Sequence, residues 1–502
     1  MQNKRLKNTL VFWFSCMVAL AILISGLFFL GKPVTKKSLV GALPVPDEGS
    51  FYILYVDESP TLLQMRNFVS LNKVLLAFPF FDRFDFRFIS MFLTILEDSK
   101  NTAFIAFPLE RKFYLAIEPE EDTILSVASG DLPPNWKKPF PDISYELVEG
   151  RFKVDVSHDF SLWMTISENV LFISTSIDDL NLMEQNITDK RKPSFPCWRI
   201  QKDWPGHLTC HMPSGVVSFN GFENIPSGVE LAWFSDNEKL QAEWMIEGIE
   251  GIFSDEEIKL FQPQKWVGKY VLPTQRSLSL GVTMVDTPEL MESVPLLANA
   301  FGQTNEKMLE FLKGQMILTV GGKADVFSFS LPGILLQFPN RGEIGKTIVS
   351  DIWRNRLKSL SINRSSIAGY ESGGAIELPI SLIAVSSDEL TLIGLISKES
   401  LSSGVSLEEA FPEIVEREFL LWVDIDFGSV ANDIERILSI GDIIGDMFNS
   451  EVSEGMPFDK KFGKLFKVAD ELRNAGHLFI GIHNLSNGEI VWQYNNLNVY
   501  GQ

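Results

Sequence analysis

Two stretches, YILYVDESPTLLQM at 52–65 and LSLGVTMVDTPELM at 278–291, decide how this sequence is interpreted. Each contains a strand-like run, a Val-Asp pair, a hydroxyl residue followed by proline, and apolar residues at helical spacing. A hydroxyl residue before proline is typical of a helix start, because the hydroxyl caps a backbone N–H and proline fits the first helical position. We therefore interpret Asp57 and Asp286 as residues that complement the positive end of a helix, rather than as catalytic carboxylates.

A third junction of this kind is expected at Val423-Asp424-Ile425-Asp426, before the helical pattern GSVANDIERIL. The spacing of Asp424, Asp426 and Gly428 also resembles part of a calcium-binding loop. Such a loop needs a third acid and a terminal glutamate, and this stretch has neither. We therefore expect a helix start here rather than a metal site.

The order of elements around the first two stretches repeats along the chain. In the first half, β-rich runs interrupted by turn residues predict hairpins at 103–119, 145–156 and 162–176. In the second half, the same signals predict hairpins at 316–333, 370–380 and 381–397. We infer two tandem copies at 51–255 and 276–500, joined by a connector at 256–275. The alternative is two unrelated domains.

Runs of hairpins with a few helices predict an α+β fold. We expect an N-terminal transmembrane helix followed by two tandem antiparallel-sheet domains, each with helices packed on one face. The chain has 502 residues, enough for two or three domains. Its net charge of −21 argues against nucleic acid as a partner, because so acidic a surface repels phosphate.

The first 37 residues form a basic tail and an apolar segment. Lys4, Arg5 and Lys7 precede an uncharged run at 8–31. That run is long enough to cross a bilayer, since a span needs about 20 apolar residues, and it exceeds the usual signal-peptide core. We expect an uncleaved anchor with residues 10–31 in the membrane, a cytoplasmic N-terminus and a periplasmic or extracellular bulk. A cleaved signal peptide and a buried helix of a soluble domain are the alternatives, and 38–50 is expected to be a linker.

The cysteines beyond the N-terminal segment allow three interpretations. Cys197 and Cys210 lie 13 positions apart, and a disulfide between them is plausible outside the cytoplasm. Two free buried thiols are the alternative. A metal site is the third possibility, because His207 and His211 lie beside Cys210, although their spacing matches no standard zinc motif.

A run of phenylalanines, FPFFDRFDFRFISMFL at 78–93, is the strongest apolar feature after the N-terminal segment. Some of these residues fall on one face of a helix, which favours a core helix packed on a sheet. The alternative is an exposed patch that binds lipid, an acyl chain or a protein. The candidate residues are Phe78, Phe80, Phe81, Phe84, Phe86 and Phe88.

Gly345-Lys346-Thr347, between a strand and a helix, imitates a phosphate-binding loop. The full pattern requires glycine five positions before Gly345, where this chain has Asn340. Glu343 would also bring negative charge close to the phosphates. We therefore expect no nucleotide and no other cofactor, and we identify no catalytic residues.

The anchor, the strand-Asp-helix openings and LPGILLQF at 331–338, before a helix ending near Trp353, resemble uncharacterised bacterial membrane-anchored extracytoplasmic families. These families are classed as domains of unknown function, and the resemblance implies no catalytic residues. The first hypothesis is a non-enzymatic envelope protein that binds a partner or scaffolds a complex. The alternatives are a binding or transfer protein for lipid or another apolar ligand, and a hydrolase with an unrecognised site.

Overall fold

The computed structural model describes most of the chain beyond the N-terminal segment. The described residues are 39–57, 99–134, 144–189, 206–211, 227–249, 262–358, 364–448 and 472–493, with short gaps at 48, 108, 111, 158–159, 236–238, 286–287, 328, 340 and 471, together with 204, 258, 466 and 468–470. They divide into two compact units. Unit 1 runs up to Ser254 and includes Leu485–Asn487, and unit 2 comprises the rest from Asp255 onward. This division falls at the predicted end of the first copy.

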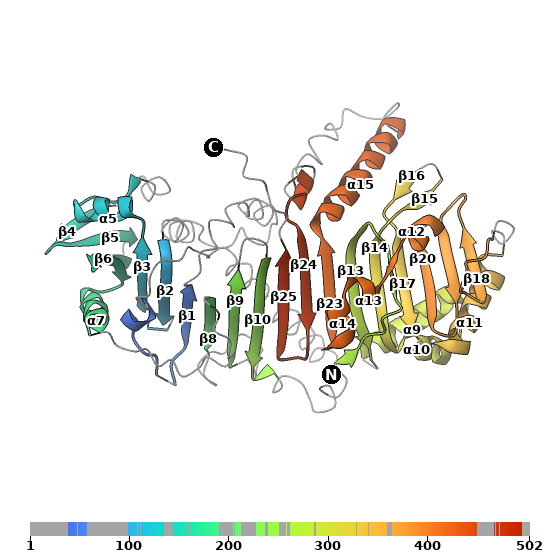
Figure 1. Cartoon of the computed structure of the whole chain (residues 1–502), viewed down its shortest axis with the longest axis horizontal. Helices are drawn as coiled ribbons and strands as arrows, with labels where there is room; N and C mark the ends of the chain where they lie inside the picture. The colour runs from blue at the N-terminus through green and yellow to red at the C-terminus, as the bar shows by residue number, and fades with distance from the viewer. Residues whose placement is uncertain are drawn as a thin grey trace. The chain divides into compact units, whose positions relative to one another are not determined.

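Unit 1 is built around one antiparallel sheet (Figure 1). Its strands pair in the order β10–β9–β8–β1–β2–β3–β7–β6–β5–β4. The strands are β1 (Tyr52–Asp57), β2 (Ser99–Phe107), β3 (Lys112–Pro119), β4 (Ser144–Val148), β5 (Arg151–Ser157), β6 (Phe160–Ser167), β7 (Val170–Ser174), β8 (Gly206–His211), β9 (Gly228–Ser235) and β10 (Lys239–Glu247). The described helices are η1 (Leu39–Ala42), α5 (Glu121–Ala128) and α7 (Ile177–Thr188).

Unit 2 is also built around one antiparallel sheet, with the order β25–β24–β23–β13–β14–β17–β20–β19–β18 (Figure 1). Its strands are β13 (Arg276–Met284), β14 (Gly314–Gly321), β17 (Ile334–Pro339), β18 (Ser372–Ile376), β19 (Leu382–Ser386), β20 (Leu390–Leu395), β23 (Leu421–Asp426), β24 (His477–Ile482) and β25 (Asn487–Gln493). Its helices are α9 (Pro288–Phe301), α10 (Asn305–Leu312), α11 (Gly342–Asp351), a π-helical turn (Ile352–Arg356), α12 (Lys398–Ser402), α13 (Leu407–Ala410), α14 (Pro412–Glu416) and α15 (Phe427–Phe448).

The two sheets have the same pairing order when the strands are taken in chain order. β1 and β13 each pair with the next long strand on one side and with a late strand, β8 or β23, on the other. The following strands, β3–β7–β6–β5 and β17–β20–β19–β18, then pair in the same sequence. All of these ladders are antiparallel, so the predicted α+β class with mostly antiparallel sheet is confirmed.

The sheet of unit 1 has an apolar core on each face. Tyr114 and Ala116 of β3 pack in one core with η1 and α7, while Leu115 and Ile117 pack in the other with Val127 of α5. Successive strand residues point to opposite faces, which explains this division. The expectation of helices on one face only is therefore wrong for unit 1.

Unit 2 has the same two-sided cover. One face packs against α9, α10 and α11 through a core that includes Phe311, Phe338 and Trp353. The other face packs against α12, α13 and α14 and against two short ladders, β11 (Gln264–Lys265) with β22 (Glu418–Phe419) and β12 (Val271–Leu272) with β21 (Val405–Ser406). Trp266 and Tyr270, in the predicted connector, belong to this second core. The connector therefore forms part of unit 2.

Several local predictions can be checked directly. Glu149 and Gly150 have positive φ at the predicted turn between β4 and β5, and Glu168 and Asn169 do so between β6 and β7. In the predicted hairpin at 316–333, however, β14 pairs with β17, and the residues between them form a separate hairpin of β15 (Ala324–Val326) and β16 (Phe329–Leu331). The predicted hairpin at 370–380 is instead the single strand β18, which pairs with β19.

The start of the described chain also differs from expectation. Within the predicted linker, η1 is buried in unit 1, and the backbone oxygen of Ala42 accepts a hydrogen bond from Asn186 Nδ2 at 3.2 Å. The predicted membrane segment at 10–31 lies outside the described residues. Among the residues that are described, no helix has both the length and the apolar character needed to cross a bilayer.

Candidate functional site

The most buried charged group in unit 2 is the carboxylate of Asp424 on β23. Trp422 and Asp424 are two positions apart, so both point to the same covered face, and both are fully buried. Arg276 Nε lies 3.2 Å from Asp424 Oδ2, and His477 Nε2 lies 2.5 Å from Asp424 Oδ1. A buried carboxylate needs such partners, because leaving it unpaired away from water is costly.

Both partners of Asp424 contact the ring of Phe411. The Arg276 guanidinium lies 4.8 Å from the Phe411 ring centre, and the His477 ring stacks on Phe411 at 6.1 Å with 19° between the planes. This packing holds the Arg276 guanidinium and the His477 ring against the carboxylate. We call Arg276, Phe411, Asp424 and His477 the Asp424 cluster.

A second set of charges joins the first turns of α15 to the same sheet. Asp426 Oδ1 accepts a hydrogen bond from the Gly428 backbone N–H at 3.0 Å, and Asp426 Oδ2 accepts one from Ser429 Oγ at 2.8 Å. Burial raises the pKa of Asp433, although Ser277 and Arg436 oppose the shift. The predicted helix start is confirmed for Asp426, while Asp424 belongs to the buried cluster instead.

The chemistry available to the Asp424 cluster is limited by these contacts. A carboxylate that orients a histidine is a familiar part of general-base catalysis. Here the carboxylate is also neutralised by Arg276, and the His477 ring lies against Asp424 and Phe411. The geometry therefore fits an ion cluster that holds β13, β23 and β24 together.

A second histidine–carboxylate contact lies at the other end of β24 and β25. Arg417 Nη1 and Nη2 lie 2.6 Å and 2.9 Å from Glu489 Oε1 and Oε2, and His483 Nε2 lies 3.8 Å from Glu489 Oε1. Arg417 also lies over the Phe419 ring at 5.2 Å. Burial by itself raises the pKa of Glu489, but the contacts with His483 and Arg417 outweigh it, and the pKa lies below its ordinary value.

The lowered pKa of Glu489 predicts a pH-dependent stability. A depressed carboxyl pKa contributes stability above the unfolded value of about 4.3, and this contribution is lost as the pH falls through the folded value. We expect Glu489→Gln to lower the free energy of unfolding by about 1 kcal/mol at pH 7, and by progressively less below pH 4. Urea unfolding at pH 7 and below pH 4 measures this loss of stability. Glu418→Gln, at an exposed carboxylate, is the control. A deficit that is independent of pH would contradict the assignment.

The structure separates the predicted metal ligands on β8. Alternation places His207 and His211 on one face of the strand and Cys210 on the other. Four residues along a strand span about 13 Å, far more than one ion with bonds of about 2 Å can bridge. Cys197 lies outside the described residues. The proposed set of Cys197, His207, Cys210 and His211 is therefore not brought together, and burial lowers the pKa of His207.

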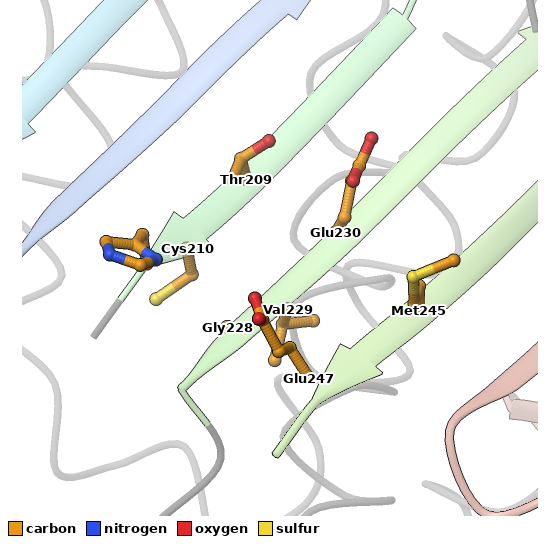
Figure 2. Close-up of a pocket in the computed structure, with 8 residues that line it drawn as sticks. Thr209, Cys210, Gly228, Val229, Glu230, Met245 and Glu247 are labelled. Atoms are coloured by element: carbon orange, nitrogen blue, oxygen red, sulfur yellow. The ribbon is translucent and has the colours of Figure 1, made fainter. Parts of the chain in front are cut away.

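A small hollow lies across β8, β9 and β10. Figure 2 shows Thr209, Glu230 and Met245 in a row across the three strands, as their pairing requires. The lining residues are Thr209, Cys210, His211, Gly228, Val229, Glu230, Met245 and Glu247. The hollow offers about 20 Å³, which is room for about one water molecule. It is too small for an acyl chain or another organic ligand.

The thiol of Cys210 gives a direct labelling prediction. Burial raises its pKa to about 11, so only about one thiol in a thousand is ionised at pH 8. We expect alkylation of Cys210 by iodoacetamide to be slow in the folded protein and fast in urea, measured by mass spectrometry of its peptide. Rapid labelling of the folded protein would contradict this burial. If the predicted disulfide to Cys197 forms, labelling in urea will require a reductant.

The residues that imitate a phosphate-binding loop serve helix packing. Gly345 lies inside α11, where an added Cβ would be 2.2 Å from Thr391 Oγ1, so glycine allows the helix to approach β20 closely. Lys346 contacts Glu371 and Asp388. Thr347 Oγ1 donates a hydrogen bond to the Glu343 backbone oxygen at 2.7 Å. These three residues are occupied by structural contacts.

Other sequence-based candidates fall outside the described part of the chain. The phenylalanines of the possible apolar patch lie outside the described residues, as do Asp286 and the side chain of Asp57. Helix α9 does begin at Pro288, as the strand-Asp-helix interpretation predicted. Sequence reasoning missed the Asp424 cluster, although one signal was available. An acid two positions after a tryptophan in a strand shares the covered face with that tryptophan.

Comparisons with known proteins add little to this geometry. No protein-family model matches the chain, and no curated protein matches it significantly. Among solved structures, crystal form III of TP0453 is similar at 9% sequence identity, covering 43% of this chain and 80% of that chain with a TM-score of 0.26. Crystal form IV of TP0453 gives 10% identity, 41% and 79% coverage and the same TM-score. Scores this low carry no argument about fold or function.

Proposed function

We propose that this chain is a membrane-anchored, extracytoplasmic protein of the cell envelope that acts as a non-enzymatic binding or scaffold module. Its apolar N-terminal segment is the anchor, and units 1 and 2 present their outer surfaces and sheet edges to partners. The observation that carries the proposal is the filling of both sheet faces in each unit by apolar side chains. Such units bind through their outside rather than through an internal cavity.

The two units are proposed to be copies of one ancestral unit. Their common pairing order supports this, because nine strands pair in the same sequence in both sheets. A long common order is what duplication leaves after sequence similarity is lost. A duplicated surface module can hold two partners, or two sites on one partner, which suits a scaffold.

The two alternative functions receive less support from the described residues. Lipid transfer needs an apolar cavity, whereas Phe311, Phe338 and Trp353 occupy the space between helices and sheet in unit 2. A hydrolase that uses a histidine–carboxylate pair needs that pair to be accessible, whereas Asp424 is fully buried and also paired with Arg276. The second such contact, between His483 and Glu489, is held by the Arg417 ion pair.

The binding proposal is tested by chemical cross-linking in intact membranes, followed by purification and mass spectrometry of both proteins and lipids. We expect cross-links from surface lysines of units 1 or 2 to a defined envelope protein, with the same partner recovered from a variant carrying His477→Gln. Loss of the partner in that variant, with folding unchanged, would point to chemistry at the Asp424 cluster. Stoichiometric recovery of lipid with the purified units would favour the lipid-binding alternative.

A further inference from the structure

The hairpin of β15 and β16 in unit 2 carries a large apolar side chain that the fold does not bury (Figure 1). Val326 pairs with Phe329, so Phe327 is the first residue of a two-residue connection between the strands. Its side chain is 68% exposed, and its φ is 57°. The turns that suit so short a connection need positive φ at this position, which favours glycine, asparagine or aspartate.

A phenylalanine at this position contributes little to folding. A left-handed backbone costs a residue with a Cβ free energy that glycine does not lose, and an exposed ring gains little from burial. The other described residues with positive φ, glycines aside, are Glu149, Glu168 and Asn169, which are polar side chains in hairpin turns. The chain therefore keeps an aromatic ring where local folding favours a small polar residue, which indicates a role outside the fold.

A second segment brings further exposed apolar side chains beside Phe327. The Phe327 backbone N–H donates a hydrogen bond to the Pro379 backbone oxygen at 2.6 Å, and Val326 forms a bridge with Ile380. Leu378 is 66% exposed, and Pro379 is exposed as well. We call Phe327, Leu378 and Pro379 the apolar tip.

The size of the apolar tip limits what it can bind. An aromatic side chain can bury about 150–250 Å², so Phe327 and Leu378, each about two-thirds exposed, offer roughly 250 Å² together. A stable protein interface needs about 800 Å² on each partner. The tip is therefore too small to hold a second copy or another protein by itself. A bilayer sets no such threshold, because each apolar side chain that enters it gains free energy separately.

The charges near the apolar tip select the kind of lipid surface. Lys323 and Asp325 precede Phe327, and Glu377 precedes Leu378. Glu377 Oε1 accepts a hydrogen bond from the Lys398 backbone N–H at 2.8 Å, which adds a second lysine. These two acids and two lysines balance, so local charge does not oppose a zwitterionic surface. The whole chain, with a net charge of −21, is repelled by anionic lipid.

We propose that the apolar tip is a bilayer contact, at which Phe327 and Leu378 enter the interfacial region of a zwitterionic phospholipid membrane. Two side chains alone bind a membrane weakly. An anchor in the same membrane raises their effective concentration at its surface, so that a weak contact becomes occupied. This part of the inference rests on the proposed anchor, whereas the lipid preference of the tip does not.

Lipid quenching of a fluorescent probe tests the contact. In a chain with Cys16, Cys197 and Cys210 replaced by alanine, Leu378→Cys carries a nitrobenzoxadiazole group. The chain is reconstituted into phosphatidylcholine vesicles with or without nitroxide-labelled acyl chains. Leu296→Cys is the matched control, because Leu296 is a 74% exposed apolar residue on α9. We expect at least threefold stronger quenching by the nitroxide lipid at position 378 than at position 296.

The variant Phe327→Asn separates membrane contact from folding. Asparagine suits positive φ, so the urea unfolding midpoint of this variant is expected to be equal to that of the parent chain or higher. Added to the probe at position 378, the same change should lower the quenching at least threefold. Unchanged quenching would overturn the proposal. A lower unfolding midpoint would also overturn it, because the ring would then serve the fold.

The remaining outcomes separate the tip from the anchor. Equal quenching at positions 378 and 296, or none at either in chains that stay with the vesicles, overturns the proposal. A probe at position 378 that is shielded from water but not quenched by lipid indicates a protein partner and also overturns it. If the full chain does not stay with the vesicles, a chain lacking residues 1–37 is tested at high lipid concentration. Selective quenching at position 378 then supports the tip and tells against the anchor, and its absence overturns both.

Discussion

Replacement of Asp424 with alanine is expected to lower the free energy of unfolding of unit 2 by about 3 kcal/mol, because it leaves the largely buried Arg276 without its counter-charge. The same change removes the group that orients His477. It also loosens the link between β13, β23 and β24. The measurement is urea unfolding followed by tryptophan fluorescence, since Trp422 lies two positions away on the same face.

A double variant separates the loss of charge from the loss of packing. Arg276→Met combined with Asp424→Leu removes both charges, so it is expected to be clearly more stable than Asp424→Ala alone. Arg354→Ala breaks the exposed ion pair with Asp351, at 3.6 Å, and should leave the unfolding transition unchanged. If Asp424→Ala behaved like Arg354→Ala, the cluster would have no structural role, and a functional explanation of the buried carboxylate would be needed.

A second large loss of stability in unit 2 is expected from Gly281→Ala. Gly281 on β13 lies opposite Trp422 on β23, and the indole lies across the glycine. An added Cβ would be 2.1 Å from Trp422 Nε1 and 2.3 Å from Cε2, so the fully buried indole would have to move. Such overpacking should cost about 3 kcal/mol. Loss of unit 2 stability in urea, with unit 1 unaffected, is the expected observation.

The matched control for this prediction is Gly428→Ala in the first turn of α15. There the nearest atom to an added Cβ is 3.4 Å away, which is ordinary contact, so stability should be unchanged or slightly improved. Unit 1 repeats the arrangement, because an added Cβ at Gly206 would be 2.0 Å from Trp233 Cε2. Gly206→Ala should destabilise unit 1 alone. Equal stability of Gly281→Ala and Gly428→Ala would refute the packing argument.

Local signals in the sequence predicted local structure well. The turns at Glu149-Gly150 and Glu168-Asn169 form as expected, because turn residues and the β-rich runs around them agree. Gly373 and Gly374 predicted a turn, but both lie within the strand β18. Gly373 has a φ of 88°, and an added Cβ would be 2.0 Å from the Ala384 backbone oxygen, so this glycine serves close strand approach within β18 rather than a turn.

Long-range features could not be predicted in the same way. Arg276 and Asp424 are 148 positions apart, and only the pairing of β13 with β23 brings them together. The elements that cover the second face of each sheet were not predicted either, because short helices such as α13 show little periodicity of their own. The burial of η1 was missed because four apolar residues in a row carry no pattern.

The proposed membrane anchor is tested most directly by fractionation of cells that make the full chain or a chain lacking residues 1–37. The truncated chain keeps Leu39–Ala42, which pack in unit 1, so it should fold normally. We predict that the full chain stays in carbonate-washed membranes and is digested by protease added outside the cytoplasmic membrane, while the truncated chain is soluble. Release of the full chain by carbonate, or protection from external protease until the membrane is broken, would contradict this account.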